Sequence, residues 1–124
     1  MKKLGLAAAL FMASLGAIGC NSDYSMEARD LTGPPVPADV TGDRMDLPAG
    51  IAVGFRAIPK RGGSELDEDA EVDFVSDDPN VVEVASTTEP RRYVVWGVGE
   101  GTTTITMRVS GADQLTIPVT IRAQ

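Results

Sequence analysis

Apolar and polar residues alternate along the second half of the chain. The run IAVGFRA places Ile51, Val53, Phe55 and Ala57 on one face, and similar alternation recurs in residues 71–75, 81–85, 102–109 and 114–123, while residues 92–98 form a compact β-prone run. A period of two is typical of β-strands with one buried face. Stretches rich in Gly, Pro, Asn and Asp separate the runs, at residues 48–50, 62–63, 77–80, 99–101 and 111–113. The pattern predicts six or seven short strands in an antiparallel sandwich.

Residues 20–43 show neither a helical nor a strand period. Pro34, Pro35 and Pro37 stand close together among polar residues. This composition is typical of an extended linker, and we therefore expect a disordered tether before a folded domain at 44–124. Within that domain Pro118 cannot donate to a strand ladder, so the last strand should be an edge or bulged there.

The first 19 residues have the layout of a secretory signal. Lys2 and Lys3 precede an uncharged, mostly apolar run from Leu4 to Ile18, and small residues follow. The apolar run of 15 residues is short for a membrane-spanning helix, which needs about 20. We expect residues 1–19 to be a cleaved signal helix, with an uncleaved membrane anchor as the alternative.

Cys20 is the only cysteine, and it directly follows this segment. Ala17-Ile18-Gly19-Cys20 resembles the lipobox of bacterial lipoproteins. The resemblance implies diacylglycerol on Cys20, cleavage before it and attachment to a bacterial membrane. In enterobacterial lipoproteins Asp after the cysteine often signals inner-membrane retention, so Asn21 favours the outer membrane. Lipidation also removes a thiol that would otherwise be free to pair between chains.

A second resemblance covers residues 44–123. The segments VDFVSDDPNVVEV, VVWGVGEGTTTITMRV and LTIPVTI resemble a bacterial Ig-like domain of group 2. Phe74 occupies the place where that family commonly has Trp, and Asp78-Pro79 matches its turn. The resemblance implies an all-β, Ig-like antiparallel β-sandwich of about seven strands over residues 44–124.

Charge and composition limit the kinds of activity. The formal net charge is −7, and after residue 19 nine Lys and Arg face 18 Asp and Glu. This balance argues against nucleic acid as a partner and against electrostatic docking on anionic lipid. The chain has no histidine, the commonest general base and zinc ligand. We expect no catalytic residues, no enzyme activity and no cofactor apart from the lipid.

Two groups of residues are candidates for binding. Trp96, Tyr93, Arg91 and Arg92 combine aromatic and basic side chains, a composition common at binding hot spots. With Val95 facing inward, Trp96 should point outward. The alternative is that Trp96 covers the edge of the sandwich or packs on the tether.

An acidic segment offers a second candidate. Asp67, Asp69 and Glu71 lie in it, and carboxylates grouped in a loop could bind Ca²⁺. The alternative is a solvated loop, since the sequence has no EF-hand spacing.

Together these features predict a lipid-anchored, non-catalytic envelope protein that displays one Ig-like module. The module would serve adhesion, scaffolding or accessory binding of an envelope protein, a surface protein or a glycan. The alternative is a small inhibitor or assembly subunit that binds one protein partner.

Overall fold

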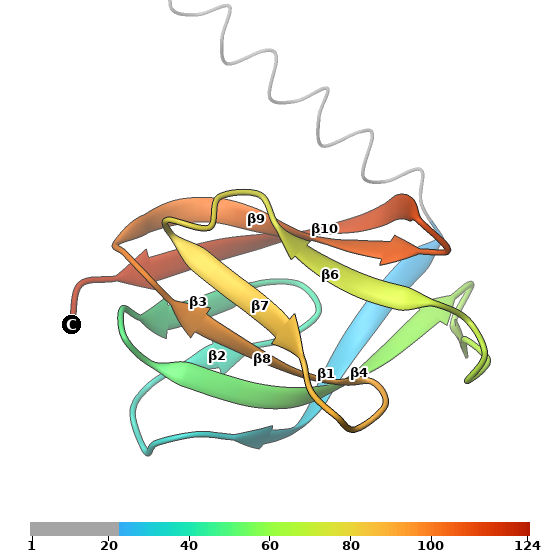
Figure 1. The fold of residues 1–124 in the computed structure, drawn as a ribbon, viewed down its shortest axis with the longest axis horizontal. Helices are drawn as coiled ribbons and strands as arrows, with labels where there is room; N and C mark the ends of the chain where they lie inside the picture. Colours follow the sequence, from blue (N-terminus) through green and yellow to red (C-terminus); the bar gives the residue numbers. More distant parts are fainter. Residues whose placement is uncertain (1–22) are drawn as a thin grey trace, which may run out of the picture.

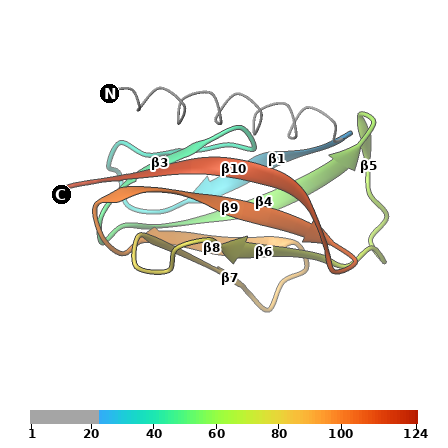
Figure 2. The ribbon, with the colours of Figure 1, turned by 90° about the horizontal axis from the view of Figure 1, so that it is seen from above.

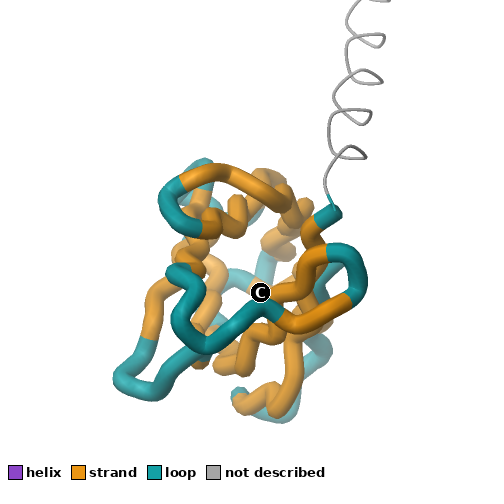
Figure 3. Tube along the Cα trace, turned by 90° about the vertical axis from the view of Figure 1, so that its right-hand side faces the viewer, coloured by secondary structure: helices purple, strands orange, loops and turns teal. Residues whose placement is uncertain are grey.

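The computed structural model describes residues 23–124, which form ten β-strands. The predicted signal segment and Cys20 lie outside the described residues. The strands are β1 (Tyr24–Thr32), β2 (Asp39–Val40), β3 (Met45–Pro48), β4 (Ala52–Arg61), β5 (Ser64–Glu65), β6 (Val72–Ser76), β7 (Val82–Ser86), β8 (Arg92–Gly97), β9 (Gly101–Val109) and β10 (Ala112–Arg122). Figure 3 shows strands joined by loops, with no helix in this part of the chain. No described helix is therefore available to cross a membrane.

The strands form two sheets that pack face to face (Figure 1). Sheet A has the order β1-β4-β8-β7, with β5 pairing β4, and sheet B has the order β2-β3-β10-β9-β6. All pairings between strands are antiparallel except β3 with β10. Four main strands on one side and the β10-β9-β6 trio on the other reproduce the immunoglobulin arrangement. The predicted fold class, an all-β Ig-like sandwich, is confirmed. The structure has ten strands rather than about seven, because it adds β1 and the two-residue strands β2 and β5, and the β3–β10 pair is parallel rather than antiparallel.

The core lies between the two sheets and follows the predicted alternation. Val53, Phe55 and Ala57 of β4 all face it, as do Ile105 and Met107 of β9. The complete cluster is Met26, Val40, Met45, Leu47, Val53, Phe55, Ala57, Phe74, Val82, Tyr93, Val95, Ile105, Met107, Val109, Ile117, Val119 and Ile121. Burying one such aliphatic or aromatic side chain contributes roughly 1.5–3 kcal/mol before conformational entropy is subtracted.

The expectation of a disordered tether over residues 20–43 is wrong from Tyr24 onward. Strand β1 pairs with β4 in register from Tyr24 opposite Arg61 to Arg29 opposite Arg56. Met26 of β1 and Val40 of β2 are buried in the core. Tyr24, Met26 and Ala28 face the core and alternate with Ser25, Glu27 and Arg29, but this period of two covers only three inward positions. It ends at the bulge after Arg29, so the prolines and polar residues that follow dominate the pattern of residues 20–43.

The prolines occur where the chain connects the two sheets. Residues 33–38 run from the end of β1 in sheet A to β2 in sheet B. The prediction that the last strand is an edge at Pro118 is confirmed. At this residue β10 pairs with β9 only, because its pairing with β3 begins at Val119. β10 is therefore an edge at Pro118, and the missing N–H leaves no ladder position empty.

The two ends of the sandwich differ in what they carry. The end where β1 begins also holds the β4–β5 hairpin and the acidic loop, and Gly62 N–H donates to the carbonyl of Asp23 at 3.0 Å. Figure 2 shows the C terminus at the opposite end from β5. Both sheets and the core cluster given above are formed by the described residues 23–124.

Candidate functional site

Trp96 lies on the solvent side of sheet A, as the alternation predicted. Val95 is fully buried, and Trp96 and Val94 on either side are half-buried on the outer surface. Trp96 is flanked by Ala52 of β4 and Glu83 of β7 in the strand register. Its indole is therefore held on a rigid sheet rather than on a loop, and part of it is open to solvent.

Tyr93 does not belong to this surface, and its proposed contact role is wrong. Its side chain is 5% exposed, because period two places residue 93 on the same inner face as Val95. Its ring centroid lies 4.7 Å from that of Phe74 and 5.9 Å from that of Phe55. Its hydroxyl donates to the carbonyl of Val72 at 2.9 Å. Burial raises the pKa of Tyr93, with the positive charge of Arg91 acting in the opposite direction.

The guanidinium of Arg91 is also engaged within the fold, where it binds main-chain carbonyls of the acidic loop. It has a φ of 62°, and its Nη2 donates to the carbonyls of Asp67 at 2.8 Å and Ala70 at 3.1 Å. The carbonyl of Asp67 also accepts from the N–H of Ala70 at 3.0 Å, so the guanidinium adds a further donor that ties the two ends of this turn to β8. Of the four predicted contact residues, only Trp96 and Arg92 share one face.

Arg92 takes part in a cluster that no local sequence pattern predicts. Strand β1 has a bulge between Arg29 and Thr32, where Asp30 has a φ of 52°. Arg92 Nη2 donates to the carbonyl of Asp30 at 3.0 Å and to Oγ1 of Thr32 at 3.2 Å. Arg56 Nε donates to the carboxylate of Asp30 at 3.1 Å. Two arginines from neighbouring strands therefore fix the bulge of β1.

Gly54 makes room for this cluster. A Cβ at Gly54 would lie 2.6 Å from Oγ1 of Thr32 and 3.6 Å from Nη2 of Arg92. The glycine in the IAVGFRA run is the only local signal, since a glycine inside a strand often marks a close approach. The residue that approaches Gly54 is Thr32, and it does so because β1 pairs with β4.

A second group of charges continues the same face towards the beginning of β1. Glu27 accepts from Lys60 at 3.2 Å and from Arg29 at 3.0 Å. The hydrogen bond from Lys60, followed by the charge of Arg29, holds the pKa of Glu27 below its ordinary value. The outer face of sheet A thus carries cations from three adjacent strands together with Trp96.

The acidic loop contains no preformed calcium site. Leu66 N–H donates to the carbonyl of Pro59, and Ser110 N–H donates to that of Glu71, so the loop is held at both ends. Asp67, Asp69 and Glu71 are exposed. Across residues 23–124, no three Cys, His, Asp or Glu residues are grouped to hold a metal ion. The calcium interpretation of the loop therefore has no support in the geometry.

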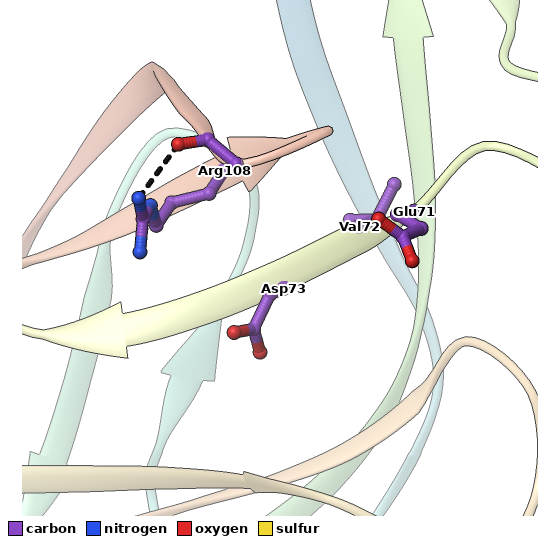
Figure 4. Close-up of a pocket in the computed structure, with 5 residues that line it drawn as sticks. Glu71, Val72, Asp73 and Arg108 are labelled. Carbon is purple, nitrogen blue, oxygen red and sulfur yellow. Dashed lines mark hydrogen bonds between the residues drawn. The ribbon is translucent and has the colours of Figure 1, made fainter.

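A recess of about 390 Å³ lies beside this loop, between β6 and the β9–β10 hairpin (Figure 4). Glu71, Val72, Asp73, Arg108 and Gly111 line it. Arg108 is turned away from both acids, because Nη2 donates to the carbonyl of Gly111 at 2.6 Å and Nε lies 3.1 Å from Oδ1 of Asp113. The recess therefore presents two carboxylates, with the guanidinium of Arg108 held by the β9–β10 hairpin.

Lys60 and Ser64, the lysine and a serine of the β4–β5 hairpin region, are not arranged as a catalytic pair. Lys60 is paired with Glu27 on the outer face of sheet A, and Ser64 is exposed in the β4–β5 hairpin opposite Arg61. No hydrogen bond joins Lys60 and Ser64 among the contacts of the described residues.

Solved structures with this fold include domains of a surface-layer protein. The crystal structure of domains 4 and 5 of the S-layer protein SbsC matches with a TM-score of 0.53 and 17% identity, over 82% of this chain and 77% of that one. The structure of its domains 5–6 matches with a TM-score of 0.50 and 24% identity, over 76% and 46%. The structure of domains 1–6 matches with a TM-score of 0.54 and 16% identity, over 82% and 20%.

At these identities the likeness establishes the fold alone. This chain spans less than half the length of the two longer segments it matches. No protein-family model matches the sequence, and no curated protein shows significant similarity to it.

Proposed function

We propose that this protein is a non-catalytic binding module of a bacterial cell envelope, anchored to a membrane through lipid on Cys20. The observation that carries the proposal is the Ig-like sandwich, which is shared with domains of a surface-layer protein. A fold of this kind hosts many activities, so the site must supply the rest of the argument. The site in question is the outer face of sheet A around Trp96.

Two further observations support a binding role. The described residues include neither His nor Cys, which leaves few groups able to act as a base or nucleophile near neutral pH. Trp96 lies on the same face of sheet A as Arg92, with Val94 between them along β8, and Trp and Arg are enriched among residues that dominate binding energy. The outer membrane and membership of the group 2 bacterial Ig-like domains are parts of the same proposal.

The lipid anchor is tested in cells by labelling with a clickable fatty acid and by fractionation. We expect label on the protein and recovery in the membrane fraction, both lost in Cys20→Ser. Ser22→Ala is the matched control, because it alters a small side chain two positions away and should change neither result. Membrane recovery of Cys20→Ser would contradict lipid anchoring.

The binding role is tested by placing a photo-crosslinking amino acid at Trp96 and, as a control, at Thr116, which is exposed on sheet B. Crosslinks from position 96 but not from position 116 are expected. One dominant protein partner would identify an inhibitor or assembly subunit, whereas glycan or several neighbours would identify an adhesive or scaffolding module. No crosslink from position 96 in intact cells would contradict binding through this face.

A further inference from the structure

The segment that joins β1 to β2 is exposed, apolar and uncharged. Residues 31–38 contain no charged side chain, and Pro34, Pro35, Val36 and Pro37 are four consecutive exposed apolar residues. Leu31 and Val36 are 48% and 38% exposed, which makes them two of the four exposed large apolar residues in the part of the chain that the structure describes. A run of exposed apolar residues is unfavourable in water and marks a surface that serves a contact.

The conformation of this segment is fixed before any contact is made. Val36 N–H donates to the carbonyl of Pro34 at 2.8 Å, which closes a γ-turn centred on Pro35. The prolines restrict the backbone further, because each of them fixes its own φ. At the end of the segment, Arg122 Nη2 donates to the carbonyl of Pro37 at 2.8 Å. A partner therefore binds a surface that has little conformational entropy left to lose.

An apolar hollow of about 180 Å³ lies beside the projecting residues. Leu31, Pro34, Val36 and Ala38 line it, and Val53 of the core also reaches it. The same patch therefore carries both projecting side chains and a depression. An interface with two-fold symmetry requires this combination, because the one surface must be complementary to itself.

The border of the patch is nearly neutral, although the protein is acidic. The charged side chains that contact the segment, flank it or pair with those that do are Asp30, Asp39 and Asp46 against Arg44, Arg56, Arg92 and Arg122. By contrast, nine Lys and Arg face 18 Asp and Glu after residue 19, so two copies of the chain repel each other over most of their surface. Two copies can approach through this patch without that repulsion.

We propose that two copies of this protein associate through residues 31–38, with Leu31 and Val36 of each copy packed over the hollow of the other. A charged partner of another kind would gain little from a balanced border. Domains that bind proline-rich peptides recognise an extended polyproline II helix, and the γ-turn at Pro35 departs from that shape. Figure 1 shows the segment at the same end of the sandwich as the C terminus, away from the beginning of β1.

Val36 and Val75 form a matched pair for a test, because both are 38% exposed and Val75 lies on β6 of sheet B. A photo-crosslinking amino acid at either position would be placed in the full chain, in cells that also express a copy with a second tag. We expect a product that joins two copies of the chain from position 36 and none from position 75. Crosslinking of position 36 to a different protein, or to nothing, would overturn the association between copies.

Sedimentation equilibrium measures the strength of the association. The full chain would be expressed, and the form that the cells produce would be purified in detergent. We expect a reversible dimer whose Kd rises about tenfold or more in Val36→Lys, because an ammonium group enters the apolar contact of each copy. Val75→Lys makes the same change at the same exposure and should leave Kd unchanged. Circular dichroism would verify that both variants keep the β-sandwich.

A protein that stays monomeric at all concentrations, or equal weakening by the two variants, would contradict the association. The contact uses neither lipid on Cys20 nor the side chain of Trp96. Failure of the proposed anchor or of binding at Trp96 therefore leaves this inference standing, and a monomeric protein leaves both of those proposals standing.

Discussion

The hydroxyl of Tyr93 donates a hydrogen bond of 2.9 Å to the main-chain carbonyl of Val72. Tyr93 belongs to β8 of sheet A and Val72 to β6 of sheet B, so this bond joins the two sheets across the core. The ring of Tyr93 meets that of Phe74 edge-on, at an interplanar angle of 72°. The side chain of Tyr93 thus packs against an aromatic ring and also supplies a hydrogen-bond donor to the carbonyl of Val72, close to the acidic loop.

Tyr93→Phe should lower the free energy of unfolding by about 1 kcal/mol, because it keeps the ring and removes one hydrogen bond. Tyr93→Ala should cost about 3–5 kcal/mol, since it also opens a cavity beside Phe55 and Phe74. Chemical denaturation with a common slope would measure both. Equal losses for the two variants would show that the ring contributes nothing beyond the hydroxyl.

The raised pKa of Tyr93 predicts that the folded protein loses stability at alkaline pH. Its pKa is raised in the folded protein, so above a pH of about 10 the unfolded chain releases a proton that the folded chain retains. The free energy of unfolding therefore falls as pH rises from that point until the folded pKa is reached. Tyr93→Phe should show a shallower decline in denaturation experiments between pH 9 and 11, taken here as roughly one unit either side of the ordinary tyrosine pKa. Parallel curves for the two proteins would contradict this assignment.

The N-terminal boundary of the domain can be tested by truncation. A chain that begins at residue 44 lacks β1 and β2, which leaves one edge of β4 unpaired and removes Met26 and Val40 from the core. We expect it not to fold cooperatively, whereas a chain that begins at residue 23 should. Met26→Ala in the longer chain should cost roughly 2–4 kcal/mol. A cooperative transition of the shorter chain would restore the tether interpretation.

Gly54 and Thr32 should be energetically coupled. Gly54→Ala places a methyl group 2.6 Å from Oγ1 of Thr32 and should destabilise the protein by about 1–3 kcal/mol. Thr32→Ala removes that oxygen, so the double variant should recover part of the loss. A double-mutant cycle measures the coupling, and strict additivity would mean that the strain lies elsewhere.

The sequence predicted well wherever one face of a strand is buried against the opposite sheet. Ile117, Val119 and Ile121 alternate with exposed Thr and Pro, and all three are in the core. It failed at Tyr93, although the same alternation that placed Val95 inside also places Tyr93 inside. The period of two, and not the aromatic and basic composition of residues 91–96, decides which face of β8 Tyr93 occupies.

The sequence by itself determined the all-β class, the segments that form most of the strands and much of the core, because alternation and turn residues act over a few positions. Only the tertiary structure decided that β1 belongs to the sandwich, that Arg91 holds the acidic loop and that Arg56 and Arg92 meet at Asp30. Arg92 and Asp30 are 62 positions apart. Their contact arises from the pairing of β1, β4 and β8, and no local pattern encodes which strands become neighbours.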